Sequence, residues 1–123
     1  MLRFWITVLC GIGAATPALA AKIASAPITQ SGGSLIECSI VNISGAAAMV
    51  TIRVINNDAQ LLSVGPVSLG GGFSQSASAF CNGTCARPRC TFITSTPATD
   101  YRASGCVADH TSTNTDKICL PAQ

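Results

Sequence analysis

The chain has 123 residues, of which 48% are hydrophobic and 10% are charged, and its formal net charge is +2. A chain this short and this apolar excludes both a multidomain enzyme and a disordered acidic or basic tail. The positive charge is too weak and too scattered to predict nucleic acid as a partner.

The first twenty residues have the pattern of a secretory signal peptide. Arg3 supplies a positive charge, the run from Phe4 to Ala15 carries none, and small residues precede the expected cleavage site after Ala20. An uncleaved membrane span is disfavoured because two glycines and a proline interrupt the apolar run. The sequence therefore predicts residues 1–20 as a cleaved signal peptide and residues 21–123 as one secreted or periplasmic domain.

Short stretches of alternating apolar and polar residues make up the mature chain. Alternation of this kind buries one face of a β-strand, and no stretch of ten residues shows a helical period. The clearest example runs from Val50 to Val54 in mostly β-branched residues. Strands are expected at residues 36–40, 50–54, 60–69 with an interruption at Gly65-Pro66, 73–81, 90–94, 101–107 and 117–120, and residues 21–34 offer room for one edge strand.

Turn residues separate these stretches, as at Asn56–Asp58 and Gly70–Gly72. Two half-apolar sheets can hide their faces only against each other, so about seven short strands predict a small antiparallel β-sandwich, immunoglobulin-like and stapled by disulfides. The core tryptophan of immunoglobulin domains has no counterpart here. The large core side chains are expected to be Phe73, Phe80, Phe92 and Tyr101.

The cysteines indicate a disulfide framework. Removal of Cys10 with the signal peptide leaves six of the seven, and an even number in an exported chain favours disulfides. Two of the six lie mid-strand facing the core, two bracket a tight turn, and two flank the loop of a terminal hairpin. The favoured pairs are Cys38–Cys90, Cys81–Cys85 and Cys106–Cys119, with Cys38–Cys106 as the alternative for the bond between the sheets.

Three short strings resemble a group of short exported bacterial proteins. They are Leu35–Asn42 (LIECSIVN), Arg89–Phe92 (RCTF) and Tyr101–Ser104 (YRAS), and they stand in this order before a Cys119–Ala122 ending (CLPA). The likeness covers most of the mature chain. It implies a β-sandwich and a bacterial origin, and because the group has no assigned activity it implies nothing about chemistry.

No catalytic or metal-binding constellation is evident. The single histidine, His110, stands in a polar loop, and no Gly-x-Ser-x-Gly element presents a serine nucleophile. Asp109 and Asp116 share that loop without the dense oxygen ligands of a calcium site. We therefore expect no enzyme activity, no cofactor and no metal.

The segment from Cys81 to Cys90 is the strongest candidate for a binding site. It holds three of the six mature cysteines, and Arg87 and Arg89 stand on either side of Pro88. A loop held by cysteines and stiffened by proline presents its side chains at low entropic cost, and paired guanidinium groups can grip one carboxylate or phosphate. Arg87 and Arg89 are therefore the candidate binding residues.

These observations predict a non-catalytic binding or adhesion module that acts on an unknown extracellular or periplasmic partner and is a monomer rather than an oligomer. The first alternative is a structural subunit of a surface assembly, in which a serine-rich strand such as 73–81 is exchanged. A small secreted inhibitor or a hydrolase is the more remote alternative.

The exported protein should begin at Ala21 and contain no free thiol, which intact mass before and after alkylation will test. Removing a native disulfide from a small secreted domain typically costs about 2–5 kcal/mol, so reduction should lower the melting temperature sharply. Alkylation of any cysteine before reduction would contradict the framework.

Overall fold

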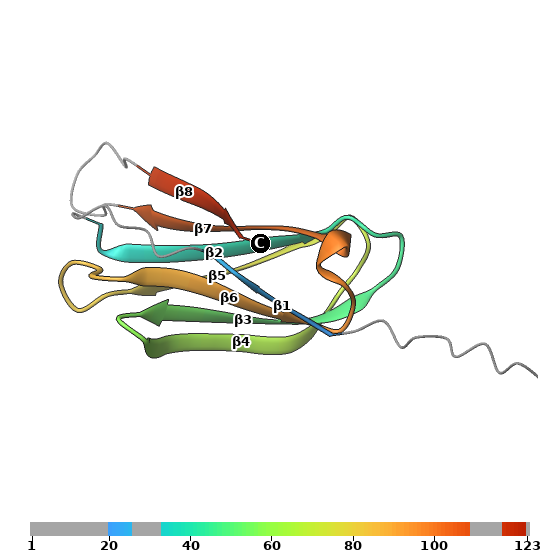
Figure 1. Cartoon of the computed structure of the whole chain (residues 1–123), viewed down its shortest axis with the longest axis horizontal. Helices are drawn as coiled ribbons and strands as arrows, with labels where there is room; N and C mark the ends of the chain where they lie inside the picture. The colour runs from blue at the N-terminus through green and yellow to red at the C-terminus, as the bar shows by residue number, and fades with distance from the viewer. Residues whose placement is uncertain (1–19, 26–32, 109–116, 123) are drawn as a thin grey trace, which may run out of the picture.

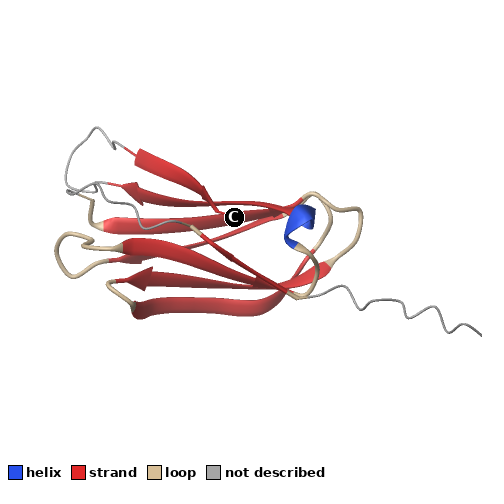
Figure 2. Cartoon of the chain, in the orientation of Figure 1, coloured by secondary structure: helices blue, strands red, loops and turns tan. Residues whose placement is uncertain are grey.

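The computed structural model describes residues 20–25, 33–108 and 117–122. These residues form two four-stranded sheets packed face to face (Figures 1 and 2). The strands are β1 (Ala21–Ala24), β2 (Leu35–Asn42), β3 (Ala48–Asn56), β4 (Ala59–Leu69), β5 (Ser74–Phe80), β6 (Pro88–Thr94), β7 (Tyr101–Ala108) and β8 (Lys117–Ala122), with one short 3-10 turn, η1 (Ala98–Asp100). Nearly all of the predicted signal peptide lies outside the described residues, and within them no helix is long and apolar enough to cross a membrane.

The predicted sandwich is confirmed, and the edge strand expected between residues 21 and 34 is β1. The first sheet has the order β1-β6-β3-β4 and the second β5-β2-β7-β8, with antiparallel neighbours throughout. As in immunoglobulin domains, the second strand neighbours the fifth and the third neighbours the sixth. The outer strands differ, because here β1 pairs with β6 and β7 pairs with β2, whereas in immunoglobulins the first strand lies beside the second and the last beside the sixth.

Apolar and polar side chains alternate along β3, and they occupy the inner and outer faces that the sequence predicts. Val50, Ile52 and Val54 are fully buried between the sheets, while Thr51 and Arg53 face outward. The β-branched side chains pack well on a pleated surface, which is why this stretch favours a strand.

The predicted interruption at Gly65-Pro66 is a bulge within the continuous strand β4. Val50 pairs with Val67 and Ile52 with Val64, so Gly65 and Pro66 together stand opposite one residue of β3. Gly65 has a φ of +111°, and a Cβ there would lie 2.5 Å from the carbonyl oxygen of Val50. Proline is tolerated because β4 is an edge strand and its missing N–H costs no ladder bond.

Two of the four aromatic residues expected in the core are not there. Phe92 and Tyr101 are buried, but Phe73 is 66% exposed and Phe80 is 61% exposed. The expectation for Phe73 and Phe80 was therefore wrong. Phe80 shares the outward face of β5 with its serines, and Phe73 lies in the turn before that strand.

All three favoured disulfides are present. The Cys38–Cys90 bond joins β2 to β6 and hence the two sheets, with the Cα atoms 5.6 Å apart. Cys81–Cys85 closes the turn after β5, and Cys106–Cys119 joins directly paired residues of β7 and β8. The alternative Cys38–Cys106 bond is not formed, because Cys38 is bonded to Cys90 and Cys106 to Cys119.

Val54→Asp should unfold the domain, since Val54 is fully buried and an unpaired buried carboxylate costs several kcal/mol. Met49→Asp is the matched control, because Met49 lies on the outward face of the same strand and is 44% exposed. Thermal melts should show loss of the cooperative transition in the first variant alone, and an intact transition for Val54→Asp would contradict the assigned faces.

Candidate functional site

Arg87 and Arg89, the predicted binding residues, lie at the start of β6. Pro88 and Cys90 are buried and Arg89 alternates with them in β6, so Arg89 faces outward from the first sheet. Arg87 is exposed in the bend immediately before the strand, and Arg89 is half-buried. The two residues therefore lie close together in the chain at the end of the sandwich where β6 begins.

The loop that carries Arg87 is fixed at both of its ends. Behind it, the Cys81–Cys85 disulfide closes the turn. Ahead of it, the backbone N–H of Arg87 donates to Asn56 Oδ1 at 3.1 Å, and the carbonyl oxygen of Arg87 accepts from the N–H of Asn57 at 3.2 Å. The loop is therefore tied to the turn between β3 and β4.

That turn brings a carboxylate to the arginines. Asn57 and Asp58 have φ values of 51° and 62°, which is the left-handed pair that a two-residue hairpin needs and that Asn and Asp tolerate. Asp58 Oδ1 lies 3.3 Å from Arg89 Nη2, with the side chains 73% and 38% exposed. Sequence reasoning did not predict this ion pair, which partly neutralises Arg89.

A third arginine, Arg53, joins them from β3. Arg53 pairs with Thr91 and Arg89 pairs with Ile55, so the two arginines are diagonal neighbours on adjacent strands of the same face. The Nε atoms of both are enclosed and have no hydrogen-bond partner. Their aliphatic stems therefore lie along the sheet while the guanidinium groups remain at its surface.

Lys22 of β1 extends the same face. Its neighbour Ile23 is buried, so Lys22 points outward, and it pairs with Ile93 of β6. We call Lys22, Arg53, Arg87 and Arg89 the basic surface.

Four of the six cationic residues in the described chain belong to the basic surface, and the other two, Arg102 and Lys117, belong to the second sheet. The basic surface has four cationic side chains, and Asp58 is the only acidic residue that the described chain places beside them. Of the other described acids, Glu37 lies on β2 of the second sheet, and Asp100 lies in η1, which contacts β1. A nearly neutral domain thus presents a positive potential on one flat face.

This arrangement can bind anions and offers no group for covalent catalysis. Arginine donors match carboxylate, sulfate and phosphate oxygens in paired geometry. His110, Asp109 and Asp116 lie outside the described residues, and within the described ranges no three His, Cys, Asp or Glu side chains cluster to hold a metal ion. The absence of enzyme activity, cofactor and metal stays a prediction.

Comparison with known proteins informs the fold alone. No protein-family model matches the chain, and no curated protein matches its sequence. A solved structure described as that of Thermotoga maritima 1070 is similar in shape, with a TM-score of 0.54 and 12% sequence identity, over 85% of this chain and 93% of the other. At that identity the likeness supports the β-sandwich and carries no function.

Asp58→Asn should leave the free energy of unfolding within about 0.5 kcal/mol of the wild-type value, because the ion pair with Arg89 is largely exposed. Chemical denaturation will measure the change. A loss of several kcal/mol would mean that Asp58 holds the hairpin turn itself rather than only facing Arg89.

Proposed function

We propose that the protein is an exported, non-catalytic binding module whose basic surface takes an anionic polysaccharide. The observation that carries the proposal is the gathering of Lys22, Arg53, Arg87 and Arg89 on one face of the first sheet, with Asp58 as the one described acid beside them. The guanidinium groups supply paired donors to carboxylate or sulfate groups.

The shape of the surface favours an extended polymer over a small anion. Lys22 is opposite Ile93, four residues along β6 from Arg89, which corresponds to roughly 13 Å along the strand. One phosphate cannot reach both cations, whereas successive charged units of a polymer can. Thr51 pairs with Ile93 as Lys22 does, from the other side of β6, and its outward hydroxyl group can hydrogen-bond to sugar.

The covalent framework supports an oxidising compartment. Three disulfides in a small domain are typical of proteins outside the reducing cytosol. Together with the predicted signal peptide they favour a secreted or periplasmic protein, where the polymers that it meets are those of the envelope and its surroundings.

The alternative, a structural subunit that exchanges strands, has less support. The edge strand β4 contains Pro66 and two register shifts, features that blunt an edge against pairing. On the other side of the sandwich β8 is bonded to β7 through Cys106–Cys119, and a bridge between Ser25 and Ala122 links the first sheet to β8. Among the described strands β5, the serine-rich strand that this alternative would exchange, does present a plain edge, so strand exchange through β5 stays the second candidate function.

Replacing Arg87 and Arg89 by Ala should weaken binding to polygalacturonate at least about ten-fold, because two charge-assisted contacts are lost. Binding should also fall as ionic strength rises. Asp58→Asn should strengthen it, since Asp58 competes for Arg89. Titration calorimetry at matched folded fraction will measure all three effects.

The matched control compares the single variants Arg87→Ala and Lys117→Ala, which remove one positive charge each, since Lys117 belongs to β8 of the second sheet. Only Arg87→Ala should lose affinity. Equal losses of affinity would mean that net charge alone explains the effect and would overturn the role of the basic surface. Binding of the protein to polyglutamate but not to polygalacturonate would overturn the proposal that the ligand is a polysaccharide.

A further inference from the structure

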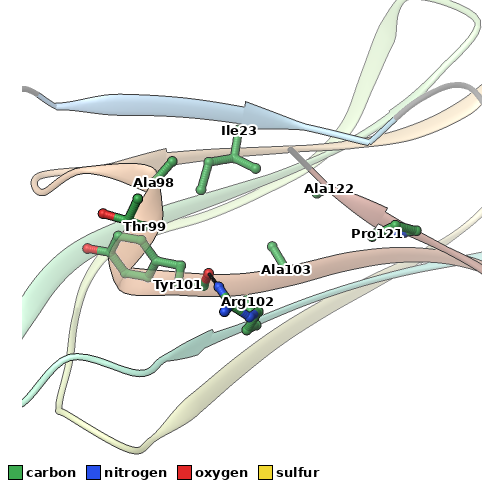
Figure 3. A pocket seen from close by; sticks show the side chains of 8 residues that line it. All are labelled: Ile23, Ala98, Thr99, Tyr101, Arg102, Ala103, Pro121 and Ala122. Atoms are coloured by element: carbon green, nitrogen blue, oxygen red, sulfur yellow. Dashed lines mark hydrogen bonds between the residues drawn. The ribbon is translucent and has the colours of Figure 1, made fainter.

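A cavity of about 400 Å3 lies on the side of the sandwich where β1 of the first sheet approaches β7 and β8 of the second (Figure 3). Its lining residue Ile23 follows Lys22 in β1 but faces inward where Lys22 faces outward, so the cavity lies on the other side of that strand from the basic surface, and nothing in the proposed function uses it. Its lining residues are Ile23, Ala98, Thr99, Tyr101, Arg102, Ala103, Pro121 and Ala122.

The strand arrangement explains why the space is open. Ala122 of β8 pairs with Ala103 of β7, and β7 continues beyond that pair to Tyr101, where the described part of β8 offers no further partner. The first sheet reaches β8 through the Ser25–Ala122 bridge. Beyond it alanine side chains line the gap between the sheets, and they are too small to fill it.

The polar groups of Tyr101 on the wall of the cavity already have hydrogen-bond partners. The Tyr101 hydroxyl lies 2.6 Å from Thr96 Oγ1, and the Tyr101 N–H donates to the carbonyl oxygen of Ala98. The carbonyl oxygen of Tyr101 accepts from Arg102 Nη1 at 3.2 Å. The floor, formed by Ile23 and the Tyr101 ring, is buried and apolar.

Arg102 is the exception among these residues. It is exposed at the rim, and one hydrogen bond to the Tyr101 carbonyl uses only part of its donor capacity. Within the described chain it has no carboxylate in ion-pair contact, and Asp100, two residues away, is not among the lining residues.

We propose that this cavity binds a small amphipathic carboxylate, whose apolar part fills the cavity and whose carboxylate pairs with the Arg102 guanidinium. The volume is within the roughly 300–1,000 Å3 typical of small-molecule sites, and an apolar lining with one charged group at the rim is their usual composition. Arginine at the rim selects an anion over an alcohol or an amine of the same length.

Titration calorimetry with octanoate, 1-octanol and octylamine tests the proposal. Octanoate should bind at least about ten-fold more tightly than 1-octanol, and octylamine should bind most weakly. Arg102→Gln, at an exposed position, should lower octanoate affinity to the level of 1-octanol, and Arg102→Lys should retain part of the preference. Ala103→Leu should weaken both octanoate and 1-octanol by filling the cavity.

Backbone amide shifts locate the bound probe. Octanoate should perturb Ile23, Ala98 and Ala103 and leave Arg53 and Arg89 unchanged, which separates this site from the basic surface. Four outcomes would each overturn the proposal. They are equal affinity for octanoate and 1-octanol, undiminished octanoate binding by Arg102→Gln, amide shift changes confined to the basic surface, and no binding of either probe. Perturbation of the basic surface would bear on the anion binding proposed there, and the other three outcomes leave the polysaccharide proposal untouched.

Discussion

Cys90 is the point at which the separate parts of this sandwich are joined. Its sulfur is bonded to Cys38 across the core, while its backbone N–H donates to Ser25 Oγ at 2.8 Å and its carbonyl oxygen accepts from the Ser25 N–H at 3.0 Å. Gly105, opposite Cys38, leaves room for this junction, since a Cβ there would lie 2.9 Å from both Cys90 Sγ and Ser25 Oγ. A core of mainly small and β-branched residues depends on such a bond, which typically contributes about 2–5 kcal/mol.

Both proposed sites follow from the strand order around this junction. β6, which carries Cys90, lies between β1 and β3 in the first sheet, and this order alone gathers cations from three strands on one face. The cavity arises where the two sheets separate. β1 pairs with β6 in the first sheet and β8 pairs with β7 in the second, and the two sheets are bridged between Ser25 and Ala122. Within the described residues no other strand covers the face that carries the cations, and the small residues beside the cavity do not close it.

The sequence predicts the strands and the disulfides well because both depend on local spacing. Alternation around Val54 identifies the buried face, and the mid-strand positions of Cys38 and Cys90 identify the bond between the sheets. The exposed positions of Phe73 and Phe80 could not be predicted, because the serines and alanines around them do not show which face of the strand is buried. Arg53 is recognisably an outward residue in its strand, but its place beside Arg89 depends on the pairing of β3 with β6, which no local pattern reveals. The cavity is invisible in the sequence for the same reason, since its walls are ordinary small residues brought together from both sheets.

The position of the Cys106–Cys119 bond also determines how the domain would respond to a pulling force. An edge strand loaded at one end normally peels from its neighbour one hydrogen-bonded pair at a time, which requires little force. If load reached the chain through Ala122, peeling of β8 would stop at Cys119, because that residue is covalently joined to β7. From β7 the load would pass to β2 across their continuous ladder of paired residues, and from β2 to the first sheet through Cys38–Cys90. Tension applied at this end would therefore reach both sheets instead of stripping β8 alone from the domain.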